Sequence, residues 1–248
     1  MDLLIFLIPL SFMMGFVSSI SGGGGVFGVP ALLAFGVPPV NALVLNRASD
    51  LGHIVGSLKN YMNVGEFDYR LGMIAIPPIL VGAFIGANLI VGVEEVLLNK
   101  IILCAVMVGV FLLLYPFKPK ENKEKPYWLS GVAALFVLGL WDGAFAMAGG
   151  TFGVLIFVFL FHQSYLSAKG VLTFAAVPET IMTVVILYMN STVQLPEVSV
   201  MFVSSIFGAF IGSKLAIKKG ARFMKYAMAA MALVMASKVL LIDVLEII

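Results

Sequence analysis

The amino-acid sequence predicts an all-α polytopic membrane protein made of two inverted-topology repeats of about five membrane segments each, with helices broken at glycine-rich turns. Hydrophobic residues make up 61% of the 248 residues and charged residues only 11%, and the mean hydropathy is +1.10. Soluble domains are about half apolar and a quarter charged. Long apolar runs and a pair of duplicated glycine motifs complete the prediction.

Apolar runs follow one another along the whole chain, and roughly 20 such residues are needed to cross the hydrocarbon core. The runs of this length are 3–20, 43–61, 71–92, 96–117, 128–148, 165–189, 198–217 and 223–242. Two shorter runs, 26–36 and 152–161, each follow a glycine cluster. The first run has no basic segment before it and no clear cleavage site, so we interpret it as a retained helix rather than a secretory signal.

Two motifs occur twice in the same order. GGVFGV at 24–29 returns as GGTFGV at 149–154, and GAFIG at 82–86 returns at 208–212, which gives offsets of 125 and 126 residues. Matches at nearly one offset predict two homologous halves. We expect a first transmembrane repeat at 1–117, a polar linker at 118–127 and a second repeat at 128–248.

Basic residues predict how the two repeats are oriented, because Lys and Arg near the ends of spans favour the cytoplasm. The linker is rich in lysine, and a second basic cluster comprises Lys214, Lys218, Lys219, Arg222 and Lys225. Both lie inside only if an even number of crossings separates them, which requires the short run 152–161 to cross rather than dip in and return. Five crossings per repeat is an odd number, so the second repeat enters the membrane in the opposite sense.

The first glycine cluster should break a helix, because each glycine in a helix interior costs about 1 kcal/mol relative to alanine. A new helix starting at Val26 would point free N–H groups and a partial positive charge into the turn, where an anion could bind. Close helix packing is the simpler explanation of one such cluster, but its duplication favours a site. The predicted anion contacts here are Ser21, Gly22, Gly23, Gly24, Gly25, Gly149, Gly150 and Thr151.

Run 43–61 carries a polar stripe at helical spacing: Asn46, Asp50, His53, Ser57 and Asn60, with Arg47 beside it. Charged groups inside a membrane mark functional sites, and the guanidinium fork suits an oxyanion, so Asn46 and Arg47 are predicted substrate contacts. An Arg47–Asp50 ion pair that only joins helices is the alternative, and the two are compatible. His53 alone is more typical of a satisfied buried histidine.

The second half carries a sparser stripe of Lys169, Thr173, Ala176, Thr180 and Thr183. We expect Lys169 to extend toward the membrane interface, since it lies a few residues inside its run. Glu179 adjoins the stripe, and Asp142 precedes the second glycine cluster. The candidates for carrying a proton are therefore Asp50, His53, Asp142 and Glu179.

Several classes of function lack support in the sequence. A net charge of +2 without a clustered basic patch does not indicate nucleic-acid binding. One cysteine, two histidines and no nucleotide-binding or hydrolytic motif indicate neither a metal site, a cofactor nor an enzyme.

The segment SGGGGVFGVPALLAFGVPPVNAL at 21–43 resembles the glycine-rich signature of the TauE/SafE family of membrane permeases, and GAFIGANL and GAFIGSKL resemble its recurring glycine segment. The resemblance covers nearly the whole chain. It implies export of sulfite or an organosulfonate across the cell membrane by a multi-pass transporter. A homo-oligomer is compatible with the sequence. An anion channel and an importer of another small anion remain alternatives.

Overall fold

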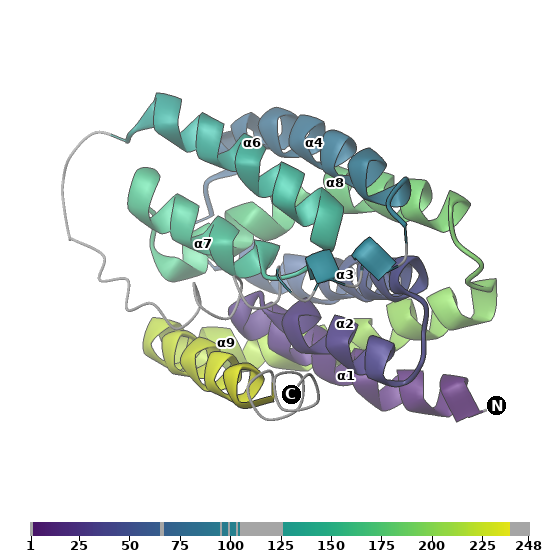
Figure 1. The fold of residues 1–248 in the computed structure, drawn as a ribbon. Coiled ribbons are helices and arrows are strands. Elements are labelled where there is room, and N and C mark those ends of the chain that lie inside the picture. Colours follow the sequence, from purple (N-terminus) through teal and green to yellow (C-terminus); the bar gives the residue numbers. More distant parts are fainter. Residues whose placement is uncertain are drawn as a thin grey trace.

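A computed structural model describes residues 2–64, 67–94, 96–98, 100–102, 104 and 126–238 of the chain. Within them every regular element is a helix (Figure 1), which confirms the all-α prediction. The helices are α1 (Asp2–Ser21), α2 (Gly24–Ala34), α3 (Pro39–Met62), α4 (Tyr69–Val91), α6 (Trp128–Phe145), α7 (Gly149–Leu160), α8 (Tyr165–Met189) and α9 (Leu195–Lys238). Most of run 96–117, nearly all of the linker 118–127 and the end of run 223–242 lie outside the described residues.

Five stretches of the described helices are long and apolar enough to cross a membrane: Leu3–Ser21, Tyr69–Val91, Trp128–Phe145, Tyr165–Met189 and Leu195–Gly220. Helix α3 has 24 residues, but the charges of Arg47, Asp50 and Lys59 lower its hydropathy. Large apolar side chains such as Leu89, Leu129 and Phe207 lie exposed on the outer helices, as a lipid-facing surface requires. The protein is a multi-pass membrane protein.

Helix α9 is two helices that meet at a glycine. Gly220 has φ 77° and ψ −177°, outside the helical region, and only glycine adopts such a conformation readily. This position separates the predicted runs 198–217 and 223–242, so the sequence placed the boundary within a few residues.

The helices that follow the glycine clusters are short. Helix α2 has 11 residues and α7 has 12, which at ~1.5 Å per residue span about 17 and 18 Å of a ~30 Å hydrocarbon core. Helix α2 turns back along α1: its Gly24 packs against Ser18, and at its far end Phe35 stacks on Phe6 with ring centroids 4.2 Å apart. Helices α1 and α2 therefore form an antiparallel hairpin.

The duplicated GAFIG motif makes two close helix contacts of the same kind. In α4, a Cβ added to Gly82 would lie 2.8 Å from the backbone nitrogen of Leu140 in α6. In α9, a Cβ added to Gly208 would lie 2.9 Å from the backbone nitrogen of Phe16 in α1. Such distances exclude any side chain, so these glycines let the backbones touch. Each motif thereby packs its helix on the first helix of the other predicted repeat.

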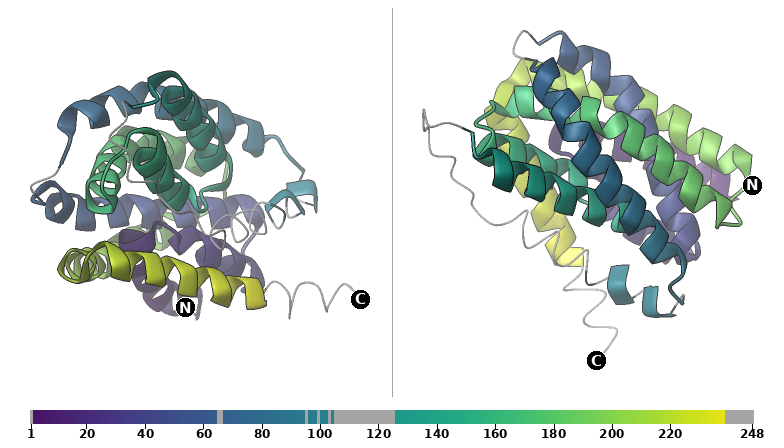
Figure 2. Two further views of the ribbon diagram at one scale, coloured as in Figure 1. Left: turned by 90° about the vertical axis from the view of Figure 1, so that its left-hand side faces the viewer. Right: turned by 90° about the horizontal axis from the view of Figure 1, so that it is seen from above.

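Helices α3 and α8 form the centre of the bundle, with α4 and α6 on one side and α1 on the other (Figures 1 and 2). Arg47 of α3 contacts Glu179 of α8, whereas Tyr61 lies beside Gly170. The residue numbers run in opposite directions along this contact, so α3 and α8 are antiparallel. Their central position brings the polar stripes of both helices into the protein interior.

Candidate functional site

The first helix break occupies two residues. Helix α1 ends at Ser21 and α2 begins at Gly24, and between them Gly22 adopts the left-handed conformation with φ +80°. The prediction that the break extends through Gly25 is wrong: Gly24 and Gly25 form the first turn of α2. Gly22 and Gly23 suffice to reverse the chain, because the Val26 N–H already bonds the Gly23 carbonyl at 3.1 Å.

The second break does not use glycine at its turn. Ala146 and Ala148 have φ of 54° and 59°, and helix α7 begins at Gly149. The prediction that Gly149, Gly150 and Thr151 form the break is therefore wrong, because they belong to the first turn of α7. A left-handed alanine costs roughly 1–2 kcal/mol, and such strain is characteristic of functional sites.

The two breaks touch each other at the centre of the molecule. A Cβ added to Gly22 would lie 2.6 Å from the backbone nitrogen of Thr151 and 2.8 Å from the Cα of Gly150. The Thr151 hydroxyl donates a hydrogen bond of 2.8 Å to the Ser21 carbonyl. The structure thus brings Ser21, Gly22, Gly150 and Thr151 together, although they are about 130 residues apart in sequence.

Asn46 of α3 connects both breaks. Its Nδ2 donates hydrogen bonds to the Ala146 carbonyl and, at 3.2 Å, to Asp50 Oδ2. Its Oδ1 faces Gly25, where an added Cβ would lie 3.0 Å away, and this oxygen has no hydrogen-bond partner within the described part of the chain. A buried, unpartnered polar atom is unusual and leaves one acceptor available beside the first break.

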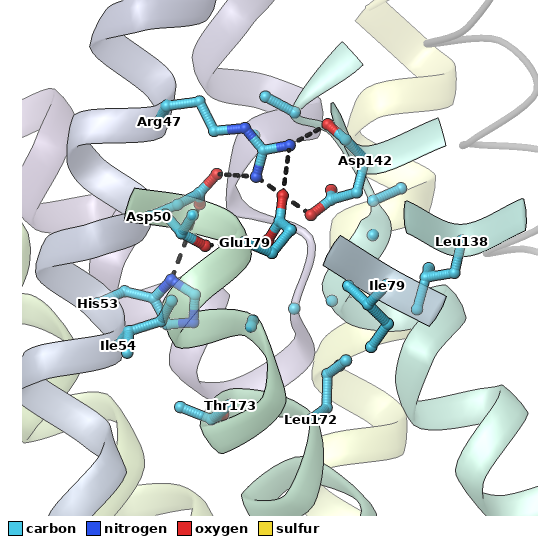
Figure 3. A pocket seen from close by; sticks show the side chains of 18 of the residues that line it. Arg47, Asp50, His53, Ile54, Ile79, Leu138, Asp142, Leu172, Thr173 and Glu179 are labelled. Atoms are coloured by element: carbon cyan, nitrogen blue, oxygen red, sulfur yellow. Dashed lines mark hydrogen bonds and ion pairs between the residues drawn. The ribbon is translucent and has the colours of Figure 1, made fainter. Parts of the chain in front are cut away.

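Arg47 is the centre of a buried ionic network (Figure 3). Its side chain is 1% exposed, and it pairs with Asp142 Oδ2 at 3.1 Å, Glu179 Oε1 at 3.3 Å and Asp50 Oδ2 at 3.9 Å. One terminal nitrogen also donates to the Asp142 backbone carbonyl. The predicted Arg47–Asp50 pair is therefore present, but it is the longest of three, and the network joins α3, α6 and α8.

Asp142 lies against the start of α7. A Cβ added to Gly149 would collide with the Asp142 carboxylate and lie 3.0 Å from its Cβ. The N–H groups of Gly149 and Gly150 stand in the first turn of α7, where a helix supplies no backbone acceptor, and a negative charge there is favourable. The Asp142 carboxylate thus occupies the position beside the start of α7 where the sequence predicted a bound anion.

A cavity lies where the breaks and the ionic network meet. It offers about 50 Å³ to the centres of water-sized molecules, and one water needs roughly 10–15 Å³ by this measure, so it accommodates a few waters or one small anion. Its apolar wall is formed by Ile54, Ile79, Leu138 and Leu172 (Figure 3). The predicted residues that line it are Gly22, Gly25, Arg47, Asp50, His53, Asp142, Gly149, Gly150 and Glu179; those outside the lining are Ser21, Gly23, Gly24, Asn46 and Thr151.

Two side chains of the lining differ from their expected roles. His53 is not a satisfied buried histidine, because its Nδ1 lies 3.7 Å from Asp50 Oδ1 and makes no hydrogen bond with a described residue. Lys169 does not reach for the interface: it is 1% exposed, lines the cavity and donates a 2.7 Å hydrogen bond to the Ser18 carbonyl. The polar stripe of α8 was the sequence signal for this inward position, because Thr173, one turn after Lys169, lines the same cavity.

The site contains the cations Arg47 and Lys169 and backbone N–H groups, all of which can bind an anion. Its carboxylates can bind a proton. In the part of the chain that the structure describes, no group of three or more His, Cys, Asp or Glu residues is arranged to hold a metal ion. The arrangement supports reversible binding of a small ion.

Comparison with known proteins agrees with this geometry. The model of the family described as "Sulfite exporter TauE/SafE" matches residues 7–239. The chain is 28% identical over 232 residues to "Probable membrane transporter protein YfcA" of Escherichia coli, covering 91% of this chain and 85% of that protein. It is 24% identical over 240 residues to "Probable membrane transporter protein" of Haemophilus influenzae, covering 96% and 94%.

These relatives are named as transporters, which confirms the expectation of a transporter rather than an enzyme. A family match over nearly the whole chain also confirms the resemblance drawn from the glycine motifs. The chain belongs to the sulfite exporter TauE/SafE family of membrane transporters.

Proposed function

We propose that this protein is a secondary transporter of the cell membrane that exports a small sulfur oxyanion, sulfite or an organosulfonate, by alternating access. The observation that carries the proposal is the cavity at the contact of two helix breaks, lined by helix-start glycines and by Arg47. Discontinuous helices that meet at a repeat interface are the usual substrate site of such transporters. The breaks and Arg47 surround the anion, Asn46 holds the two breaks together from outside the lining, and the family supplies the chemical class of the anion.

Inverted repeats are part of the proposal, and the helix contacts support them. Helix α9 packs on α1, and α4 packs on α6. Gly208 and Gly212 meet Phe12 and Phe16 in rising order, so α1 and α9 run in the same direction. Ile79 and Ala83 likewise meet Gly139 and Gly143, so α4 and α6 run in the same direction.

The central helices complete this relation. Gly52 and Gly56 of α3 meet Phe202 and Ile206 of α9 in rising order, so α3 runs with α1 and α9, and α8 runs against α3. On the other side, Gly72 of α4 packs on Phe174 of α8. Such reciprocal contacts are what a two-fold relation between 1–117 and 128–248 requires.

The lining of the cavity supports the same relation. Arg47 and Thr173 are 126 positions apart, as are His53 and Glu179, and all four line the cavity. Equivalent positions of α3 and α8 thus face one volume. A binding site shared by two rigid repeats can open to either side when one repeat rocks against the other.

The charges of the cavity indicate that a proton accompanies the anion. Asp50, Asp142 and Glu179 oppose Arg47 and Lys169, so with His53 neutral the lining carries a net charge of −1. A second negative charge is unfavourable in a buried volume unless a carboxylate is neutralised. Anion binding therefore strengthens as the pH falls, and the KM for sulfite decreases. The membrane potential contributes about 2.3 kcal/mol toward export per 100 mV for each net negative charge moved, and a proton that accompanies the anion reduces this contribution.

The test is flux in proteoliposomes that contain the purified full chain. Sulfite, sulfate, sulfoacetate and chloride are compared as substrates, with and without a pH gradient. We expect saturable flux of sulfite or sulfoacetate that exceeds chloride flux and responds to the pH gradient. Flux that rises linearly with concentration and includes chloride identifies an anion channel and contradicts the proposal.

A further inference from the structure

We propose that Lys169 is a further anion-binding residue and makes the direct ionic contact with the transported oxyanion. This inference rests on the proposed function and adds a residue to its site. The sequence had suggested an interfacial position for Lys169, and the structure places it in the cavity.

Lys169 is a buried cation with unused donors. Its side chain is 1% exposed, and its only hydrogen bond to a described residue is to the Ser18 carbonyl at 2.7 Å. An ammonium group carries three N–H donors, so two remain. No described carboxylate forms an ion pair with it within 4.0 Å, and Asp50 acts on its charge only through space. Burying an ammonium without an ion-pair partner is unfavourable, and binding an anion from solution removes this cost.

The position of the ammonium group places it at the junction of the helix breaks. The Ser18 carbonyl that Lys169 bonds also accepts the Gly22 N–H at 2.8 Å. Gly22 in turn touches Gly150, in the first turn of α7. The ammonium and the start of α7 therefore lie on the same side of the cavity. Asp142 offsets the partial positive charge of the helix start, whereas the Lys169 ammonium is bonded only to a neutral carbonyl.

Arg47 is less available for the same contact. Both of its terminal nitrogens bond Asp142, and one also pairs with Glu179. Only its Nε lacks a hydrogen-bond partner within the described residues. The carboxylates around Arg47 must move or be neutralised before its fork faces an anion, whereas Lys169 needs no such change.

The ligand that fits is a compact oxyanion. One oxygen accepts from Lys169, and a second accepts from Arg47 Nε, which has no hydrogen-bond partner among the described residues. The apolar wall that includes Leu138 and Leu172 accepts no hydrogen bond, so a short carbon chain on the anion finds an apolar neighbour there. Sulfite and small sulfonates have this form.

The test compares three variants of the full chain. Lys169→Met keeps an unbranched side chain and removes the charge, and Lys169→Arg restores the charge. Lys59→Met makes the same change at an exposed lysine of α3 and is the matched control. For each, the KM and maximal rate of sulfite flux are measured in proteoliposomes, and the stabilisation by sulfite is measured by thermal unfolding in detergent.

We expect Lys169→Met to raise the KM for sulfite about 10- to 100-fold, the worth of one charge-assisted hydrogen bond, and to remove the thermal stabilisation by sulfite. Lys169→Arg should recover most of both, and Lys59→Met should match the wild type. A wild-type KM in Lys169→Met overturns the inference. So does a fall in maximal rate alone with the sulfite stabilisation retained, which identifies a structural role.

Should Lys169→Met fail to fold, the Lys169→Arg variant decides: a KM within twofold of wild type supports charge recognition, and a KM raised as far as expected for Met contradicts it. Failure of the proposed function is seen separately. In that case the wild-type protein itself shows no saturable flux of sulfite or sulfoacetate.

Discussion

The two helix breaks have the same place in the fold and opposite chemistry. At the first, a glycine supplies the left-handed residue, and a neutral amide, Asn46, lies beside the start of α2. At the second, two alanines supply the left-handed residues, and a carboxylate, Asp142, lies beside the start of α7. The start of α7 is thus already neutralised, while the start of α2 is not.

This difference indicates how one site can serve both an anion and a proton. A duplicated site with two bare helix starts would bind anions strongly and release them slowly. Arg47 reaches Asp142 from α3 at 3.1 Å, and under the proposed function Asp142 would compete with the anionic substrate for the positive groups at the second break. In the proposed function, the first break would recognise the anion, and the second would set the charge at which it binds.

The largest expected effect is loss of the link between the breaks. Arg47→Met leaves Asp50, Asp142 and Glu179 buried without their cation, and breaking a buried ion pair in this way costs about 3–5 kcal/mol. We expect a large fall in the unfolding temperature in detergent together with loss of sulfite flux. Wild-type stability in this variant would show that Arg47 does not hold the network together.

The next largest effect is expected where the two helix breaks touch, at Gly22. Gly22→Ala places a Cβ at φ +80°, 2.6 Å from the Thr151 nitrogen, so we expect the left-handed cost and overpacking to destabilise the protein by about 2–4 kcal/mol. Denaturation in detergent measures the change, with flux as a second readout. Gly36→Ala has a similar φ of +85° and open space around it, and it serves as the control for conformation alone.

An exchange of the polar partners sharpens the comparison. Asn46→Asp makes the first break acidic, and Asp142→Asn makes the second neutral. At an effective dielectric constant near 20, one charge at ~7 Å is worth about 2 kcal/mol, so the KM for sulfite should change by roughly tenfold or more. We expect it to rise in Asn46→Asp and to fall in Asp142→Asn, with the pH dependence of flux weakened in the second. Changes of equal sign would contradict the division of roles.

The smallest effect concerns the strained alanine. Ala148→Gly removes the cost of a left-handed alanine, which stabilises the folded protein by roughly 1–2 kcal/mol. It also increases the conformational entropy of the unfolded chain, which destabilises the folded protein by about 0.4–1 kcal/mol. The stability measured by denaturation should therefore change by less than about 1.5 kcal/mol, and the KM for sulfite should stay within twofold of wild type. A large loss of flux would mean that the methyl group itself contacts the substrate.

The sequence predicted most helices because apolar length and periodicity are local properties. Run 165–189 coincides with α8, and the glycine clusters indicated both breaks to within three residues. The turn at Ala146 and Ala148 was not predictable, because nothing local distinguishes an alanine that the surrounding fold forces to positive φ.

The sequence predicted which residues belong to the candidate site but not which of them contact each other. Residues 46–53 and Glu179 were identified as polar groups in apolar runs, which needs no knowledge of the fold. That Asp142 would approach Gly149, and that Lys169 would turn inward to Ser18, depends on how α6, α8 and α1 pack. The stripe of α8 indicates which face Lys169 occupies, but the identity of a partner on another helix has no signal in one sequence.

Counterflow tests the central claim, carrier-type binding of a sulfur oxyanion between the breaks, most directly. Proteoliposomes loaded with unlabelled sulfite are diluted into a trace of radiolabelled sulfite, and the label inside is followed with time. An alternating-access carrier accumulates the label transiently above its equilibrium level, because unlabelled sulfite leaving on the same site returns the site to the outside. Entry of the label without any overshoot, in vesicles that do pass sulfite, would contradict the account.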